Sequence, residues 1–480
     1  MTNSFVFSTR GSSALCVHSV LLGCAMTWIT CAKIVTRCPC ERLSQCTHYR
    51  ANEVTMVAVG TCGEWFISTC DTKLIAVHTK QAREAFVFDC TTAEKKPKNT
   101  GSDNKSDGGA TEEAGNDKIL AFAVSPSGNL VALTDDTKRL VLFRCQPSWQ
   151  CISTRWVVRR CTSLVFSQAE EEVLVADKSG DVYSFSVVEP YKEGELKLGH
   201  LSMLLAITMT PNDKYIITAD RDEKIRVSHH KSPYNIQSFC LGHREFVSAL
   251  LIPSGHPQWL LSGSGDGTMK LWECESGRKL QSCDLREPGD APTSESEPHK
   301  KPTVCRIACS PDGRHIAVQC ERVPTVQLFG LRKEAEERLV PCSKLTLPHC
   351  PLDVTFDLQG RLWVLMGSGD TPVQIYTYTQ DCWELDAESP ETTRVTEALR
   401  PHWETLKGAA GAESRFQHLY KVNFDNMASY MQKKQQRLEQ QKQQGNKRPA
   451  GSRAKAANGA ASKKAKQDEA EAEADAQSST

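Results

Sequence analysis

Three residues between positions 243 and 266 are of types that could carry out chemistry. His243, Ser262 and Asp266 are the residue types of an acyl-transfer triad, in which a histidine activates a serine and a carboxylate orients the histidine. Their setting indicates another use, because the histidine follows a glycine, the aspartate lies in a tight turn, and Trp272 ends the strand-like run after that turn. Such a set can tie a loop to a strand through hydrogen bonds. We therefore predict a structural set of these four residues, and no catalytic residue in the chain.

Other candidate chemistry is weak. No glycine-rich phosphate loop follows a strand and opens a helix, so the sequence predicts no bound nucleotide or S-adenosylmethionine and no cofactor of its own. His229 and His230 are adjacent at a strand end, where surface histidines are more common than metal ligands. Cys38 and Cys40, with Cys46 nearby, lack the second pair of ligands that a zinc site needs. No metal site is predicted.

An internal repeat predicts the elements that position these residues. The repeat is clearest up to Trp272, where a Gly-His pair, two alternating segments and a turn lead to the tryptophan. Equivalent closing positions fall at Phe88, Phe143, Phe185, Ser228, Phe329 and Tyr376. Four of the six intervals between closing positions measure 42 to 47 residues, which is the period of a four-stranded WD-type blade. The sequence therefore predicts an all-β fold, a seven-bladed WD40-type β-propeller over residues 56–385.

Polar segments account for the two longer intervals. Residues 91–118 and 286–302 are rich in glycine, proline, serine and charge, so we predict loop insertions that cannot bury enough surface to order. Residues 1–55 carry no repeat, and their apolar run is too diluted by polar residues for a convincing membrane span. We interpret them as a disordered extension or as sequence ahead of an alternative start at Met56.

Composition narrows the class of protein. The 58 basic and 58 acidic residues balance, which argues against a globally basic nucleic-acid binder. The 21 cysteines are scattered singly through strand-like segments, as at Cys90, Cys145, Cys274 and Cys320. They form no compact framework, so we predict reduced core thiols in a cytosolic or nuclear protein.

The apolar period changes from two to about 3.6 after residue 400. Six large apolar residues then form one stripe: Phe416, Tyr420, Phe424, Met427, Met431 and Leu438. This stripe predicts a C-terminal helical segment over residues 398–443.

The last residues, 445–480, hold no core-forming run and are predicted to be a disordered tail with basic and acidic stretches. Two basic clusters in this tail have the spacing of a bipartite nuclear import signal: Lys447, Arg448, Lys463, Lys464 and Lys466. The tail therefore predicts localisation to the nucleus.

Charged residues at the turns of the third and fourth repeats form a candidate docking surface. The residues concerned are Lys178, Arg221, Asp222, Lys224 and Arg226. Ordinary solvated turns are one interpretation of their alternating signs. The other is an electrostatically complementary rim, because rim loops are where propellers meet partners. The fourth repeat also resembles an incomplete copy of the hydrogen-bonded set, with His200, Asp222 and, in the place of the tryptophan, Ser228.

Several segments closely resemble a single family. They include ADKSGDVYSF (176–185), ADRDEKIRVS (219–228), FCLGHREFVS (239–248) and LYKVNFDNMASYMQKK (419–434). Over residues 57–445 the chain resembles the WD-repeat, non-catalytic subunit of tRNA (guanine-N7-)-methyltransferase. The first two segments are far more specific than the repeat pattern, whereas residues 1–55 depart from the family.

The resemblance implies a heterodimer with an S-adenosylmethionine-dependent, Rossmann-type catalytic subunit, and no membrane partner. That subunit would hold the cofactor and form N7-methylguanosine at position 46 of tRNA, while the propeller stabilises it and helps to hold the tRNA. The five turn residues would then be docking residues. Arg226 looks like the partner of a glutamate on the catalytic subunit, a task that suits its planar guanidinium. The competing class is a generic WD-repeat assembly scaffold or a ubiquitin-ligase substrate receptor.

Overall fold

The structure is a computed structural model that describes residues 56–96, 115–286, 302–367, 372–411, 413–421, 431 and 433–437. The extension 1–55, the larger part of both loop insertions and the tail 445–480 with its basic clusters lie outside the described residues. The chain divides into two units, 1–51 and 52–480, and every described residue belongs to the second unit.

The described part of this second unit contains 28 strands in seven sheets, each built from four consecutive antiparallel strands. Blade one consists of β1 (Val59–Cys62), β2 (Trp65–Cys70), β3 (Lys73–His78) and β4 (Phe86–Asp89), followed by the 3-10 turn η1 (Cys90–Thr92). Blade two consists of β5 (Ile119–Val124), β6 (Leu130–Asp135), β7 (Arg139–Arg144) and β8 (Gln150–Trp156). Blade three consists of β9 (Cys161–Phe166), β10 (Glu172–Asp177), β11 (Asp181–Ser186) and β12 (Glu195–Gly199).

The remaining four blades follow in the same order. Blade four consists of β13 (Leu204–Met209), β14 (Tyr215–Asp220), β15 (Ile225–His229) and β16 (Ile236–Cys240). Blade five consists of β17 (Val247–Leu251), β18 (Trp259–Ser264), β19 (Thr268–Glu273) and β20 (Lys279–Asp284). Blade six consists of β21 (Val304–Cys309), β22 (His315–Cys320), β23 (Thr325–Leu331) and β24 (Leu339–Thr346). Blade seven consists of β25 (Pro351–Phe356), β26 (Leu362–Met366), β27 (Val373–Thr379) and β28 (Cys382–Leu385).

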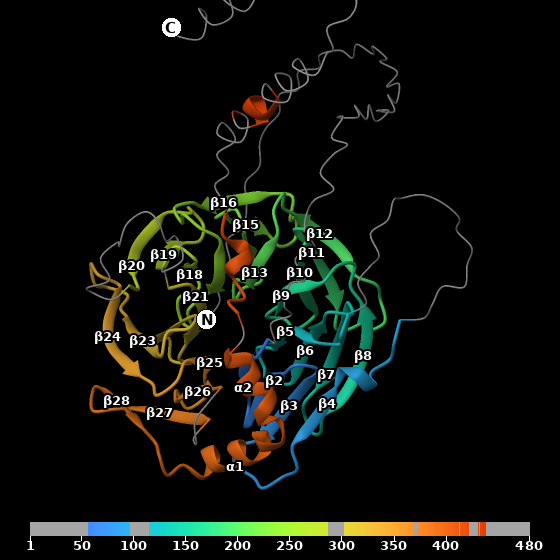
Figure 1. Cartoon of the computed structure of the whole chain (residues 1–480), viewed down its shortest axis with the longest axis vertical. Coiled ribbons are helices and arrows are strands. Elements are labelled where there is room, and N and C mark those ends of the chain that lie inside the picture. Colours follow the sequence, from blue (N-terminus) through green and yellow to red (C-terminus); the bar gives the residue numbers. More distant parts are fainter. Residues whose placement is uncertain are drawn as a thin grey trace, which may run out of the picture. The chain divides into compact units, whose positions relative to one another are not determined.

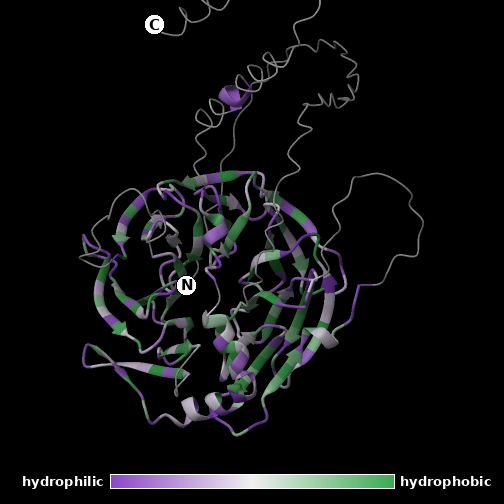
Figure 2. Ribbon diagram, in the orientation of Figure 1, coloured by the Kyte–Doolittle hydropathy of each residue, from purple (hydrophilic) through white to green (hydrophobic). Residues whose placement is uncertain are grey.

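The seven sheets close into a ring. The first strand of each blade packs beside the first strand of the next, and β1 packs beside β25 (Figure 1). Middle strands such as β6 and β18 are buried along their whole length, whereas the outer strands β16 and β20 are largely exposed or half-buried. Because a middle strand has a neighbouring blade against each face, apolar residues follow one another without alternation at its start, as in LVAL of β6 and WLL of β18. Figure 2 shows the hydrophobic residues concentrated along the strands. The predicted seven-bladed propeller is confirmed.

The register confirms the closing positions of six blades and corrects the seventh. In blade five Trp272 pairs with Leu260, the second residue of β18, and the other closing residues pair at the corresponding place in blades two, three, four, six and seven. In blade one that place belongs to Val77, opposite Phe66. Phe88 was the wrong choice, because it lies in the fourth strand, β4. The outer strand FVFD carries the same apolar alternation as a third strand, so the pattern alone does not separate them.

The helical segment begins earlier than predicted and is interrupted. It contains α1 (Pro390–Leu399), η2 (Arg400–His402), α2 (Trp403–Gly411) and η3 (Gln417–Leu419), and residues 431 and 433–437 are helical. Proline at the first position of α1 suits a helix start, because that N–H has no helical partner anyway. Phe416 and Tyr420 do not lie on one α-helix, because only the short 3-10 turn η3 separates them and contacts with the propeller fix the chain on both sides of it. Phe424, Met427 and Leu438 lie outside the described residues.

Helices α1 and α2 cover the seam between blades one and seven. Val395 and Leu399 of α1, together with Leu406 of α2, are fully buried in one cluster with apolar residues of β2, β3, β26 and β27. Arg361 and Lys80, from the two sides of the seam, lie 2.5 and 3.1 Å from the carboxylate of Glu391. Each blade is complete in itself, so no strand is exchanged between the first and the last. The helices therefore cover the seam at which the ring closes, and we call them the clasp.

Candidate functional site

The predicted hydrogen-bonded set of blade five joins three parts of that blade. His243 precedes β17, Ser262 lies in β18, Asp266 lies in the turn after β18, and Trp272 lies in β19. His243 Nδ1 is 3.0 Å from Asp266 Oδ2, and His243 Nε2 is 2.7 Å from Ser262 Oγ. The Trp272 Nε1–H donates to Ser262 Oγ at 2.8 Å. The set thus links the connection before the blade to its second and third strands.

This set has the connectivity of a triad without access for a substrate. Ser262 and Trp272 are 0% exposed and His243 is 5% exposed, so the hydroxyl cannot meet a substrate carbonyl. Burial lowers the pKa of His243 and favours its neutral form. Burial also opposes ionisation of Asp266, but the hydrogen bond from His243 holds the pKa of that carboxyl well below its ordinary range. A neutral histidine and an ionised aspartate therefore stabilise the blade.

Blade four contains a shorter version of the same set. His200 Nδ1 lies 3.2 Å from Asp220 Oδ2, and His200 Nε2 lies 2.8 Å from Thr218 Oγ1. The prediction of Asp222 as the carboxylate was wrong. Asp220 ends β14 and also accepts the amide N–H of Lys224 at 3.0 Å, so it caps the turn from the strand end. Ser228 occupies the position of the tryptophan, as predicted.

Arg226 lies in β15 and bridges blades three and four. Its Nε donates to Ser228 Oγ at 3.2 Å, and its Nη1 donates to the carbonyl of Gly199, the last residue of β12, at 2.9 Å. Burial lowers the pKa of Arg226. The ordinary pKa of arginine is so high that the guanidinium nevertheless stays charged. Both contacts are to neutral acceptors, so the positive charge of this half-buried arginine has no hydrogen-bonded carboxylate within the described chain.

The other candidate docking residues lie on one face of the ring. We call this the upper face. It carries the turns between the second and third strands of each blade and the connections from one blade to the next. Lys178 lies in the β10–β11 turn and Lys224 in the β14–β15 turn, both exposed, whereas Arg221 and Asp222 of the latter turn are half-buried. The structure therefore brings all five predicted residues together on two neighbouring blades.

Part of the C-terminal chain crosses this face. Arg221 Nε donates to the carbonyl of Leu419 at 3.0 Å, and Lys421 Nζ lies 3.9 Å from Asp222 Oδ1. In Figure 1 this segment runs from α2 across the middle of the ring toward β13. Sequence reasoning missed the contact, because the helical stripe suggested that these residues lie on one continuous helix.

Exposed apolar side chains, which sequence reasoning also missed, gather on the same two blades. Of the 14 exposed large hydrophobic residues in the described chain, eight lie between positions 188 and 241, on the outer strands and loops of blades three and four. They are Val188, Tyr191, Leu196, Leu201, Tyr234, Ile236, Phe239 and Leu241. Concentrated exposed apolar surface is typical of an interaction site. The sequence signal is a Pro-Tyr pair in both outer loops, at positions 190–191 and 233–234.

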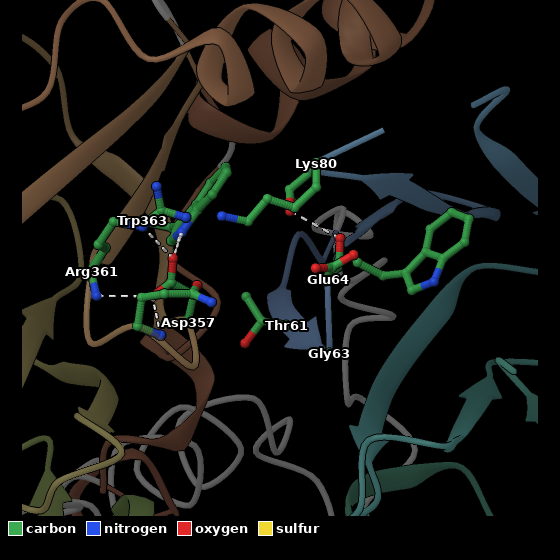
Figure 3. A pocket seen from close by; sticks show the side chains of 10 residues that line it. Thr61, Gly63, Glu64, Lys80, Asp357, Arg361 and Trp363 are labelled. Atoms are coloured by element: carbon green, nitrogen blue, oxygen red, sulfur yellow. Dashed lines mark hydrogen bonds and ion pairs between the residues drawn. The ribbon is translucent and has the colours of Figure 1, made fainter. Parts of the chain in front are cut away.

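A small cleft lies at the seam between blades one and seven. Figure 3 shows Asp357, Arg361 and Trp363 on one side of it and Glu64 on the other. Its charges are paired: Asp357 Oδ2 accepts from Arg361 Nε at 2.7 Å and from Trp363 Nε1 at 2.9 Å. This cleft belongs to the ring closure. Within the described residues, no group of three or more His, Cys, Asp or Glu side chains could hold a metal ion.

The predicted core position holds for some of the cysteines that the structure describes, whereas Cys151, Cys342 and Cys382 are exposed. The 15 cysteines of the described ranges are all free, and Cys90, Cys145, Cys274 and Cys320 are buried. None of the helices in these ranges has both the length and the apolar character needed to cross a membrane.

Comparisons with known proteins agree with the fold and identify relatives. The family model of the tRNA methyltransferase TRM82 WD40 domain matches residues 63–195 and 188–381. A tRNA (guanine-N(7)-)-methyltransferase non-catalytic subunit of Danio rerio is 61% identical over 386 residues, covering 80% of this chain and 92% of its own length. The subunit of that name from Homo sapiens is 43% identical over 380 residues, covering 78% of this chain and 90% of its own.

Solved structures show similarity at the level of the fold. The RRP9 WD40 repeats superpose with a TM-score of 0.51 at 18% identity, covering 66% of this chain and 88% of theirs. The structure of U3-55K gives a TM-score of 0.51 at 17% identity, covering 66% of this chain and 90% of its own. At such identities the likeness extends to the propeller alone.

Proposed function

The chain belongs to the WD-repeat non-catalytic subunits of tRNA (guanine-N(7)-)-methyltransferase, and from this premise we propose that it docks a catalytic methyltransferase subunit on blades three and four. The catalytic subunit binds S-adenosylmethionine and forms N7-methylguanosine at position 46 of tRNA. The propeller stabilises that subunit in a heterodimer and helps to position the tRNA. No step of the chemistry is assigned to this chain.

One observation carries the choice of surface. Blades three and four hold the five charged candidates and more than half of the exposed large apolar side chains in the described residues. Apolar side chains and charges of both signs on the same two blades can supply a hydrophobic driving force and fix the register of a partner.

Arg226 is the proposed anchor of this surface. It is half-buried and fixed by Ser228 and Gly199, so little side-chain entropy is left to lose when a partner binds. Its charge is not neutralised by a hydrogen-bonded carboxylate of the described chain, and a planar guanidinium suits a glutamate of the catalytic subunit.

A generic scaffold or a ubiquitin-ligase substrate receptor is the second candidate. The family match disfavours it, and so does the upper face of the ring, which is partly occupied by the chain's own residues 413–421. Purification from cells separates the two: the proposal expects a methyltransferase in equal amount with the propeller. A ubiquitin-ligase adaptor in its place would support the alternative.

The activity assay is direct. With S-adenosylmethionine and tRNA, the isolated chain should transfer no methyl group, and the reconstituted pair should do so. Methyl transfer by the chain alone, freed of any co-purified partner, would overturn the proposal. No binding between the two purified chains would overturn it as well.

We also propose that the protein is nuclear, on the strength of the basic clusters in 445–480. Deletion of this tail should leave partner binding intact and move the protein to the cytoplasm. Unchanged nuclear accumulation of the deletion variant would show that import depends on another segment or on the partner.

A further inference from the structure

Residues 414–421 form a strap that crosses the upper face from blade six to blade four. At its start the backbone N–H of Arg415 donates to the carboxylate of Glu321, in the turn after β22, at 3.0 Å, and Ser414 bonds the same carboxylate. Arg415 Nη2 also donates to the carbonyl of Cys305 in β21 at 3.4 Å. The strap is therefore fixed to blade six before it reaches the middle of the face.

The middle of the strap is fixed to blade five by two aromatic rings. Phe416 stacks on Phe246 with ring centroids 5.7 Å apart, and Tyr420 meets the edge of Phe246 at 5.0 Å. The Tyr420 hydroxyl lies 2.6 Å from Thr303 Oγ1 and donates to the carbonyl of Gly265 at 3.2 Å. Aromatic pairs of this geometry are stabilising beyond the area they bury.

The end of the strap contacts the turn of blade four. Lys421 Nζ lies 2.6 Å from Glu223 Oε1, and Arg221 donates to the carbonyl of Leu419. Glu223 has a φ of 71°, in the left-handed region that non-glycine residues seldom adopt. Burial, together with the positive charges of Lys178 and Arg221, lowers the pKa of His418 in the strap. The end of the strap is therefore fixed to the turn of blade four.

We propose that the strap is a positioning element, which holds the turn of residues 220–224 in the conformation that the catalytic subunit binds. The inference rests on the proposed function. A turn already held by Leu419 and Lys421 loses less freedom on binding than a free turn, so the strap raises the affinity for the partner without touching it. Tyr420 and Lys421 are its positioning residues.

Charge reversal at the end of the strap tests the proposal. Lys421→Glu places a negative charge against Glu223 and Asp222 and should release this end from blade four. We expect the affinity of the full chain for the catalytic subunit to fall about fivefold or more, the usual scale of coupling between sites. Lys421→Arg should keep wild-type affinity, and Glu223→Lys combined with Lys421→Glu should recover part of the loss.

The chain offers a matched control. The side chain of Lys407 in α2 is 47% exposed, as is that of Lys421, and it pairs with Glu404 at 3.3 Å. Lys407→Glu should leave affinity unchanged. If Lys421→Glu also binds as wild type does while Arg226→Leu fails, the strap proposal is overturned and the docking surface stands.

Hydrogen exchange of the isolated full chain tests the strap without a partner. The amide of Arg221 donates to the carbonyl of Met203 at 2.9 Å, and the amide of Lys224 to Asp220. Both amides should exchange faster in Lys421→Glu, and in Tyr420→Phe, which keeps the ring but loses the hydroxyl contacts. Unchanged exchange in both variants would overturn the proposal even if the wild-type chain bound no partner.

Discussion

Blades five and four use the same scaffold for different ends. In blade five the histidine, serine, aspartate and tryptophan are all present, and Lys270, on β19 at the place of Arg226, is buried and donates to Ser282 of the same blade at 2.7 Å. In blade four a serine replaces the tryptophan, and Arg226 reaches the neighbouring blade. The blade that lacks the tryptophan is thus the one whose third strand directs an arginine to the neighbouring blade.

This difference shows where interaction residues arise in a repeat fold. In a complete set the polar groups form hydrogen bonds with one another inside the blade, and none is left for a partner. An incomplete set retains the histidine and carboxylate that hold the turn, while the third strand is free to carry other side chains. Blade four is therefore a better place for a docking site than blade five.

The largest expected effect is in blade five. Trp272→Ala removes a fully buried ring and the hydrogen bond to Ser262, and should cost about 3–5 kcal/mol of unfolding free energy. Thermal or denaturant unfolding of the isolated chain measures this. A cost below that of an ordinary surface change would mean that blade five is not held by this set, and the contrast with blade four would disappear.

Arg226→Leu should affect binding more than folding. Loss of its bonds to Ser228 and Gly199 should cost about 1 kcal/mol of stability. A partner carboxylate left buried and unpaired should cost about 2–5 kcal/mol of binding free energy, which is well over a tenfold loss of affinity. Calorimetric titration with the catalytic subunit measures the loss of affinity. Arg314→Leu is the control, because the side chain of Arg314 on blade six is 80% exposed. Equal binding by both variants would move the docking surface away from blade four.

Acidification should weaken blade five through its histidine. The pKa of His243 is lower in the folded chain than in the unfolded one, because burial disfavours the imidazolium. Its contribution to stability is therefore complete above the ordinary histidine value of about 6.5 and is lost as the pH falls through the folded pKa. The unfolding free energy of His243→Gln should decrease less between pH 7 and pH 5 than that of the wild-type chain. Denaturant unfolding at intervals of about one pH unit measures the difference. Identical pH profiles would show that His243 does not titrate in this range.

The smallest effect is expected at Ser228, the counterpart of Trp272. Ser228→Ala removes one acceptor from Arg226 and should cost about 1 kcal/mol or less in stability. Affinity for the partner should change only slightly, since Gly199 still holds the guanidinium. A loss as large as that of Arg226→Leu would show that the serine itself forms part of the docking surface.

Much of the fold was predictable because each blade repeats the same alternation at a fixed period. Blade one was assigned wrongly at Phe88, since an outer strand and a third strand share one pattern. The carboxylate of blade four was misassigned for a related reason. Spacing copied from blade five points to Asp222, but Asp220 at the strand end reaches both His200 and the turn.

The candidate docking residues could be selected from the sequence, and the structure places them on two adjacent blades. The contacts that depend on distant parts of the chain could not be selected. Nothing in the local pattern of residues 414–421 shows that Glu321, Phe246 and Glu223 lie under them, because those partners come together only when the ring closes.

The clasp has a consequence for the order in which the protein is made. A ribosome that has finished blade seven at Leu385 has not yet made Val395, Leu399 or Leu406, the residues that cover the seam. All seven blades of the nascent chain then exist, but the apolar cluster around Phe66 and Trp363, whose rings meet across the seam, is not yet covered by the helices. Domains generally fold as units during synthesis, and exposed apolar surface favours aggregation. A premature stop codon between these positions should therefore yield a chain with every blade and no durable fold, subject to rapid degradation.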